Sequence, residues 1–245
     1  AWGNAEKPDL AVDGSGGVYV AWEAFDGAET RIAFNRSLNF GHTWLDEEYT
    51  LVSGAFEARR ARVACDSSGH VYVAWLAHDG ASEPVFFSRS SDHGETWSAP
   101  VRIPTTAEGE SFSSWVNIAC DDAGHVYIAY IDSRDDGTHV WFRASSDHGA
   151  TWDTDTRIDP NQSGPYALVM KTSGEGRIHA AWIGTGNTRL WTNASTDHGA
   201  TWLPTPVQAD GHGDTSPLTA QPDIAIGPSG TAYVTYVDMR TGGFD

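Results

Sequence analysis

Histidine is the first residue type whose placement could support chemistry, because five of the 10 histidines recur at matching places. His93, His148 and His198 occupy one position in three copies of an octet, and His70 and His125 occupy one position in two turns. Imidazole binds metal ions and transfers protons near neutral pH. Residues that recur once per repeat are expected to lie about one repeat unit apart, too far for one metal ion. We therefore expect turn-surface histidines, and predict neither a metal site nor a cofactor.

One acidic segment, Asp132-Ser-Arg-Asp-Asp-Gly137, has the alternation of a calcium-binding loop. Arg134 occupies a ligand place in it, and Arg143 stands where such a loop needs a bidentate glutamate. The match is weak, so Ca²⁺ is the only ion that we leave open.

The octet Ser-x-Asp-x-Gly-x-Thr-Trp is the clearest repeat. Its copies end at Trp44, Trp97, Trp152 and Trp202, at spacings of 53, 55 and 50 residues. The defining residues are Asn39, Gly41 and Trp44 in the degenerate copy, then Ser90, Asp92, Gly94, Thr96, Trp97, Ser145, Asp147, Gly149, Thr151, Trp152, Ser195, Asp197, Gly199, Thr201 and Trp202. We expect the Asp to accept hydrogen bonds from its own turn, the Gly to supply a positive φ, and the Trp to bury its ring between sheets. The octet is interpreted as structural.

A second repeated unit precedes each octet, with an apolar strand, a Gly-containing turn and an aromatic-rich strand. Its copies end at Trp22, Trp75, Tyr130, Trp182 and Tyr236, at spacings of 53, 55, 52 and 54 residues. Two independent markers thus share one period, and each period contains four predicted strands. Four antiparallel strands per period predict an all-β fold, a β-propeller of four-stranded blades.

Composition excludes several classes of partner. The formal net charge is −18, with 15 Lys and Arg against 33 Asp and Glu. Nucleic acids and anionic membranes are bound mainly through cationic side chains, so neither is an expected partner. No apolar stretch is long enough to insert into a membrane. The two cysteines, Cys65 and Cys120, occupy matching repeat positions, and we expect buried thiols rather than a bridge.

The octet resembles the Asp-box, or bacterial neuraminidase repeat, and the pattern VYVAW…S.D.G.TW resembles Asp-box propellers grouped with exo-sialidases. The resemblance covers nearly the whole chain and implies a single Asp-box propeller domain over residues 1–245. Five strand pairs and four octets give about 4.6 blades. The resemblance implies a ring of about six or seven blades. We therefore expect a domain incomplete at its C-terminus, which more of the chain or another chain completes; a five-blade closure is the less favoured alternative.

Connections opposite the octets are expected to form the binding face. Guanidinium groups bind carboxylates through paired hydrogen bonds, so arginines there are candidate ligand-binding groups. Arg59 and Arg60 fall in the connection over 52–61. Two matching Asp-x-Arg turns add Asp132, Arg134, Asp238 and Arg240. A turn that repeats by blade also fits an ion pair that ties a loop, and this alternative is favoured for the second group.

The resemblance also implies a catalytic set. Sialidases hold the substrate carboxylate with three arginines and use an aspartic acid and a tyrosine nucleophile supported by glutamate. The candidates are Tyr166, Glu57 and Asp79, with Glu108 and Glu110 as further partners for the tyrosine. No convincing tyrosine–glutamate set emerges, so the catalytic residues stay unassigned.

Three functions follow as hypotheses. The first is an extracellular propeller that serves as a binding or scaffold module for glycans or partner proteins. The second is an exo-sialidase-type glycoside hydrolase, or a fragment of one. The third is a propeller subunit that another chain completes in a larger assembly. All three imply an extracellular, periplasmic or cell-surface location.

Overall fold

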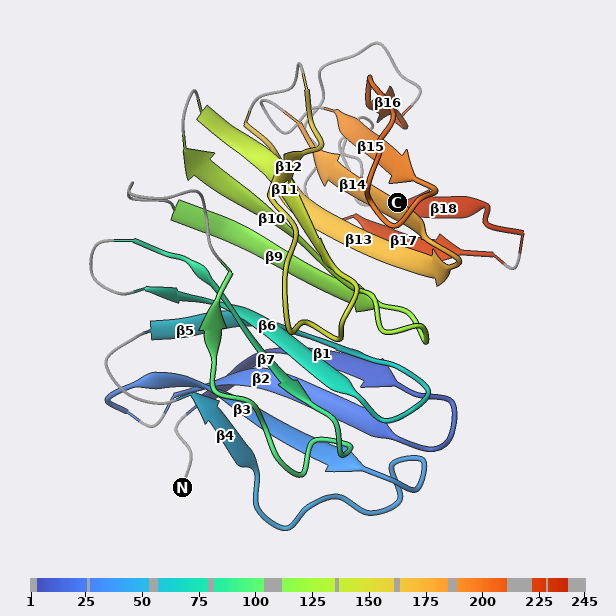
Figure 1. Ribbon diagram of the computed structural model, residues 1–245. Helices are drawn as coiled ribbons and strands as arrows, with labels where there is room; N and C mark the ends of the chain where they lie inside the picture. The colour runs from blue at the N-terminus through green and yellow to red at the C-terminus, as the bar shows by residue number, and fades with distance from the viewer. Residues whose placement is uncertain are drawn as a thin grey trace.

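The chain is described by a computed structural model over residues 4–25, 27–52, 57–78, 82–103, 112–134, 137–160, 164–184, 189–210, 222–227 and 229–237. Every regular element in these residues is a β-strand, and the strands form four four-stranded antiparallel sheets and one two-stranded sheet (Figure 1). Within the described segments, there is no helix long and apolar enough to cross a bilayer.

Each four-stranded sheet is built from consecutive strands, paired in chain order. The first sheet holds β1 (Asn4–Val12), β2 (Val18–Phe25), β3 (Thr30–Ser37) and β4 (Tyr49–Val52). The second holds β5 (Glu57–Cys65), β6 (Val71–His78), β7 (Val85–Ser90) and β8 (Val101–Arg102). The third holds β9 (Phe112–Cys120), β10 (Val126–Arg134), β11 (Gly137–Ser145) and β12 (Thr156–Arg157). The fourth holds β13 (Tyr166–Gly174), β14 (Arg177–Ile183), β15 (Leu190–Ser195) and β16 (Val207–Gln208). The fifth holds β17 (Asp223–Ile226) and β18 (Ala232–Thr235).

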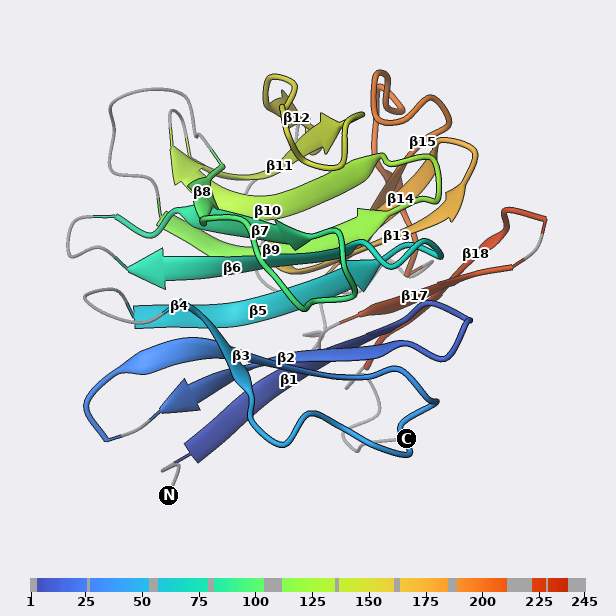
Figure 2. The ribbon, with the colours of Figure 1, turned by 60° about the horizontal axis from the view of Figure 1, so that its bottom comes forward.

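The sheets stand side by side as blades (Figure 2). Consecutive sheets meet mainly through their first strands, because β1 contacts β5, β5 contacts β9, β9 contacts β13, and β13 contacts β17. The first strand of each blade is therefore its inner strand. Across the described residues, no comparable set of contacts joins the first sheet to the fifth, so these blades form an arc and do not close into a ring.

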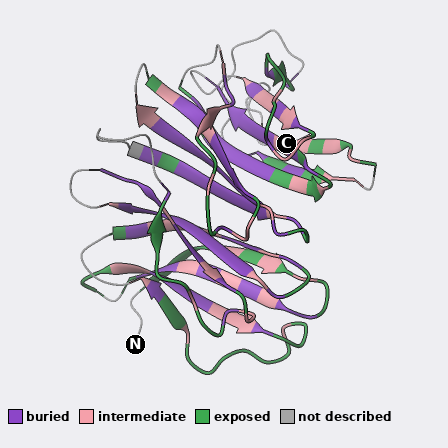
Figure 3. Cartoon of the chain, in the orientation of Figure 1, coloured by how far each residue is buried: buried purple, intermediate pink, exposed green. Residues whose placement is uncertain are grey.

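The core lies between blades, and strand alternation explains how. All but the last residue of β6 is buried (Figure 3). One set of its side chains, including Val73 and Trp75, packs toward the first sheet, whereas Tyr72 and Leu76 pack toward the third. A strand with apolar residues on both faces is stable only when a sheet covers each face. This is the packing that a propeller blade provides.

Three details differ from the sequence-based expectations. The outermost strands β8, β12 and β16 have two residues each, whereas the sequence pattern predicts a longer strand, over 97–103 in the second blade. The inner strand β5 begins at Glu57, so Arg59 and Arg60 lie in a strand and not in the predicted connection. Cys65 and Cys120 are free thiols, partly rather than fully buried.

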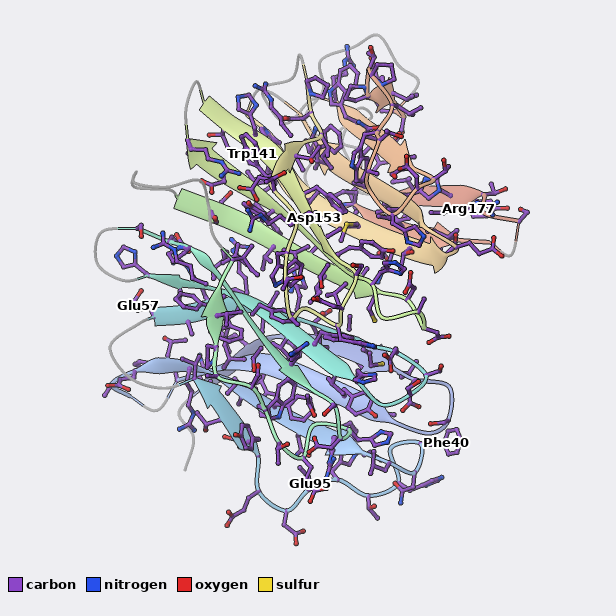
Figure 4. The ribbon with its side chains drawn as sticks, viewed as in Figure 1. Phe40, Glu57, Glu95, Trp141, Asp153 and Arg177 are labelled. Atoms are coloured by element: carbon purple, nitrogen blue, oxygen red, sulfur yellow. The ribbon has the colours of Figure 1, made fainter. Side chains whose placement is uncertain are left out.

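Two ends of the blades can now be defined. The octet end carries the four octets and the turns between the first two strands of each sheet, such as residues 66–70. The loop end is the opposite one, where β2 connects to β3 and β6 to β7. Figure 4 shows Glu57 at the loop end and Phe40 and Arg177 at the octet end.

Candidate functional site

The octets form hydrogen-bonded turns of one design. In the copy after β7, Asp92 accepts bonds from the Thr96 amide at 2.8 Å and from the Ser90 hydroxyl at 2.6 Å. The Ser90 hydroxyl in turn accepts the Gly94 amide at 2.8 Å. The copies after β11 and β15 repeat these bonds. Asn39 replaces the aspartate in the first copy and accepts the Thr43 amide at 2.8 Å. The octet is thus a turn that satisfies its own polar groups.

Each of the last three octets also joins its blade to the preceding one. The Trp97 ring packs edge-on against Phe34 of the first sheet, with ring centroids 4.9 Å apart. A Cβ on Gly94 would lie 2.6 Å from the Phe34 ring, so glycine is needed both for this approach and for φ +81°. Trp152 with Phe87 and Trp202 with Phe142 repeat the contact. The first-octet Trp44 is 41 % exposed, so burial between sheets is wrong for that ring.

The expectation that the repeated histidines lie about one blade apart is wrong for two pairs, each formed by a histidine of a turn and a histidine of an octet. His70, in a turn of the second blade, and His148, in the octet of the third, have ring centroids 4.2 Å apart. His125 and His198 repeat the pairing at 4.0 Å. Equivalent histidines do belong to different blades, but the turn of one blade meets the octet of the next. The recurrence of both motifs was visible in the sequence, whereas the one-blade offset between them was not.

At the loop end, the inner strands share an unusual backbone feature. The pairing of β1, β5 and β13 with their neighbours is interrupted by a bulge near the loop end. Lys7, Arg60 and Ala167 occupy the same place in these bulges, with φ of +50°, +56° and +54°. A bulge bends a strand and redirects a side chain. Here it turns Lys7 and Arg60 away from the regular alternation of their strands.

A chain of contacts runs from the first blade to the fourth, through one residue of each inner strand and Glu23 of β2. Glu23 accepts hydrogen bonds from Lys7 Nζ at 2.9 Å and from the Arg60 amide at 2.5 Å. The Arg60 guanidinium carbon lies 4.3 Å from the Trp115 ring centroid. Trp115 in turn packs edge-on against Tyr166, at 5.3 Å. These five residues are called the inner-strand row.

Arg60 is the group in this row that is free to bind a ligand. Within the described part of the chain, its guanidinium makes no ion pair, and its contact is the face of Trp115. Burial lowers the pKa of Arg60 from its usual value, but a guanidinium stays protonated at neutral pH. A cation held on an aromatic face and partly removed from water attracts anions more strongly than one in bulk water.

The surroundings of the row are polar and open. Glu57 is exposed. Arg59, on the same strand, is engaged in an ion pair with Glu83. A hollow of about 200 Å³ lies beside Glu23 and is also lined by Asn4, Glu6, Phe25 and Thr30. Because Glu23 also holds the Arg60 amide, this hollow adjoins the row.

The other described loop-end candidates are enclosed in the protein. Arg134 is almost enclosed, with its guanidinium carbon 3.6 Å from the Trp141 ring centroid and its Nη1 2.7 Å from Asp155. Arg143 pairs with the same aspartate. Asp132 has no exposed surface. Arg134 is thus ion-paired, as the alternative interpretation of the Asp-x-Arg turns predicts. The structure does not bring Arg134 to Arg60.

Only some of the catalytic candidates lie in the described residues. Tyr166 is 42 % exposed, and among described residues no carboxylate is hydrogen-bonded to its hydroxyl. Glu57 pairs in register with His78. Outside the described residues lie Asp79, Glu108, Glu110, Asp136, Asp238 and Arg240. The catalytic and calcium predictions that use them stay predictions.

These blades and their inner strands define the class of fold, a sialidase-like β-propeller. The Hadza microbial sialidase Hz136 superposes with a TM-score of 0.67 at 16 % identity, over 95 % of this chain and 53 % of its own. The NanB sialidase from Streptococcus pneumoniae (a K499G mutant) gives 0.65 at 12 %, over 99 % and 60 %. The polysaccharide lyase Uly1 gives 0.61 at 14 %, over 98 % and 56 %.

The likeness is one of fold. The chain spans about half to three-fifths of the length of these three proteins. No protein-family model matches the sequence. No curated protein matches it either. One fold carries several chemistries in these neighbours, so function must be argued from the inner-strand row.

Proposed function

We propose that this chain is a glycan-binding propeller that takes a carboxylated saccharide at the loop end. Arg60 would hold the carboxylate, and the exposed ring of Tyr166 would pack against the apolar face of the sugar. Because glycans of this kind occur outside cells, the proposal includes an extracellular, periplasmic or cell-surface location.

The observation that carries the proposal is the placement of Arg60. Its guanidinium has no ion-pair partner among the described residues, although the protein carries more than twice as many acidic as basic residues. A free cation inside such an acidic protein favours a small anionic group over a large anionic surface. The neighbouring Trp115 fixes the guanidinium plane, which suits recognition of a planar carboxylate.

The structural neighbours support a saccharide as the ligand class. Two of the three are sialidases and the third is a polysaccharide lyase. The aromatic rings of the row and the adjoining hollow give a partly apolar surface with a few fixed polar groups, as ligand sites generally do.

A binding comparison tests the proposal. Isothermal titration of sialyllactose, of a uronate oligosaccharide and of neutral lactose should give binding only for one or both of the carboxylated saccharides. Arg60→Gln should weaken that binding about 10-fold or more, since a charge-assisted hydrogen bond contributes about 1.5–3 kcal/mol. Arg60→Lys should weaken it less, and Lys7 shows that lysine fits such a bulge.

Arg102 provides the control, because it is exposed on the outer strand β8. Arg102→Gln removes the same charge and should leave the affinity unchanged. If Arg60→Gln and Arg102→Gln lost the same saccharide affinity, the loss would be due to net charge and not to the position of Arg60. Equal affinity for the neutral sugar would overturn the carboxylate assignment.

Catalysis is the second candidate, and the observation that favours it is the exposed Tyr166 two contacts from Arg60. An exo-sialidase would release the fluorophore from a fluorogenic sialoside. Tyr166→Phe would abolish that turnover while it preserved binding. Binding without turnover in the unaltered full-length protein would favour the binding module.

A further inference from the structure

The octet end holds two clusters of metal-binding side chains that cross blade interfaces. In the first cluster, Oδ2 of Asp66 lies 2.7 Å from Nδ1 of His70 and 4.0 Å from Nδ1 of His148. Asp66 and His70 belong to the turn of the second blade, and His148 to the octet of the third. Two imidazoles and a carboxylate thus converge on one point.

The second cluster repeats the first at the next interface. Oδ2 of Asp121 lies 3.0 Å from Nδ1 of His125 and 3.8 Å from Nδ1 of His198. In both clusters, the ligand atoms all lie within 4.8 Å of one another. The repetition gives two independent examples of one geometry in a single chain.

These distances fit a tetrahedral Zn²⁺ ion. Zinc binds imidazole nitrogen and carboxylate oxygen at about 2.1 Å, which places neighbouring donors of a tetrahedron about 3.4 Å apart. The observed pairs, 2.7 with 4.0 Å and 3.0 with 3.8 Å, lie on either side of that value, and the shorter contact in each cluster is a hydrogen bond that the ion would replace. Small side-chain rotations would bring the donors to equal distances.

The surroundings hold the octet histidine in place. His148 has φ +56°, and its amide donates to the Gly124 carbonyl at 2.9 Å. A Cβ on Gly124 would lie 2.6 Å from Nε2 of His148, so the ring rests on that glycine with Nδ1 toward Asp66. The Tyr72 hydroxyl lies 2.8 Å from the same Nδ1. A zinc ion bound at Nδ1 would replace this hydroxyl contact, because a ring nitrogen offers one lone pair.

The first cluster is also open to solvent. His70, Tyr72 and His148 line a pocket of about 480 Å³. A three-residue site beside such a pocket leaves the fourth coordination position for water. The strongly negative protein also attracts cations to its surface.

The first blade interface lacks one ligand and so provides an internal comparison. Asp13 and His93 lie 4.0 Å apart there, but the position of His70 is taken by Gly17. A Cβ on Gly17 would lie 2.1 Å from Asp13, so the side chains as placed leave no room for a third ligand. Two groups hold a metal ion far less well than three.

From this geometry we propose two Zn²⁺ sites per chain, Asp66–His70–His148 and Asp121–His125–His198, each of which ties consecutive blades together at the octet end. The sites are independent of the saccharide site at the loop end.

Zinc titration tests the proposal. After treatment with a chelator and dialysis, calorimetric titration with ZnCl₂ should give two equivalents bound, and the melting temperature should rise with free Zn²⁺. His70→Gln and His125→Gln should each remove one equivalent, or weaken one site more than 10-fold, and the double variant should bind none. Co²⁺ should give the visible absorption of a four-coordinate ion, and each variant should halve it.

Two controls address other sources of binding. His42 is exposed in the first octet, and His93 lies at the two-ligand interface. The variants His42→Gln and His93→Gln should each still bind two equivalents of zinc. If His70→Gln fails to fold by circular dichroism, His70→Gly replaces it, because the first interface carries glycine there. Retention of two equivalents by the double variant would overturn the proposal. So would the absence of zinc binding to the unaltered chain at about 10⁻⁴ M free zinc, a concentration at which even weak surface sites bind.

Discussion

The hydroxyl of Tyr72 lies 2.8 Å from Nδ1 of His148, which joins strand β6 of the second blade to the octet of the third. Tyr19 with His93 and Tyr127 with His198 make the same 2.8 Å contact. The octet is therefore a connector between blades as well as a turn within one.

Glycine in the octet should be irreplaceable for two separable reasons. Gly149→Ala would place a Cβ 2.5 Å from the Phe87 ring at φ +78°, whereas Gly174→Ala has φ +77° and nothing within 4 Å. We expect Gly174→Ala to cost about 1–2 kcal/mol for the backbone alone, and Gly149→Ala to cost a further 1–3 kcal/mol, approximately, for overpacking. Urea unfolding measures both. Equal costs would show that the Phe87 contact is unimportant.

Acid should destabilise the octet turns and with them the fold. Hydrogen bonds from Ser90 and Thr96 lower the pKa of Asp92 to about 2, and those from Thr151 and Ser145 lower the pKa of Asp147 to about 2. A carboxylate with a lowered folded-state pKa stabilises the fold above its unfolded value near 3.8 and loses this contribution as the pH falls toward 2. Stability should therefore decline between about pH 4 and pH 2.

Asn39 supplies the control for the acid experiment, because the first octet already folds with an amide there. The double variant Asp92→Asn, Asp147→Asn should lose less stability than the unaltered chain between pH 5 and pH 2, roughly the range over which these carboxyls titrate. An unchanged pH profile in urea unfolding would assign the acid sensitivity to other carboxylates.

Asp155 should be essential for the third blade. It pairs with both Arg134 and Arg143 and accepts a hydrogen bond from Tyr130 at 2.7 Å, and its side chain is 2 % exposed. Asp155→Ala would remove the buried anion that Arg134 and Arg143 share, and we expect a loss of about 3–5 kcal/mol. Glu95→Ala, which removes an exposed partner of Arg36, should cost at most about 1 kcal/mol. Similar losses in thermal or urea unfolding would contradict this placement.

Cys65 should react slowly with alkylating reagents. Burial, with the nearby Asp13, raises the pKa of its thiol to about 12. Because only the thiolate reacts, alkylation by iodoacetamide at pH 8 should be about 1,000-fold slower or more than for an unperturbed cysteine. Mass spectrometry of the native and urea-unfolded chain gives both rates. Comparable rates would show that the thiol is not held in the environment described.

Local sequence signals predicted the blades well, because strand alternation and the octet act over short distances. The pairing of β5, β6 and β7 and the turn around Asp92 follow from residues close in the chain. The inner-strand row could not be predicted in this way. Arg60 lies in a bulge of β5 where a loop was expected, and its contact with Trp115 joins two consecutive blades.

The histidine clusters could not be predicted from the sequence for a related reason. Repeat spacing gives the separation of equivalent residues, but it does not tell which turn of one blade faces which octet of the next. His70 and His148 meet because consecutive blades pack with their octet ends in register. Tertiary packing, rather than a sequence motif, assembles both the Arg60 site and these clusters.

The most direct test of the proposed function is a crystal structure of the chain with the carboxylated saccharide that binds most tightly. The account predicts the carboxylate within hydrogen-bond distance of the Arg60 guanidinium, about 3 Å, with the sugar ring against Tyr166. A saccharide bound at the octet end, or a carboxylate held by groups other than Arg60, would contradict it.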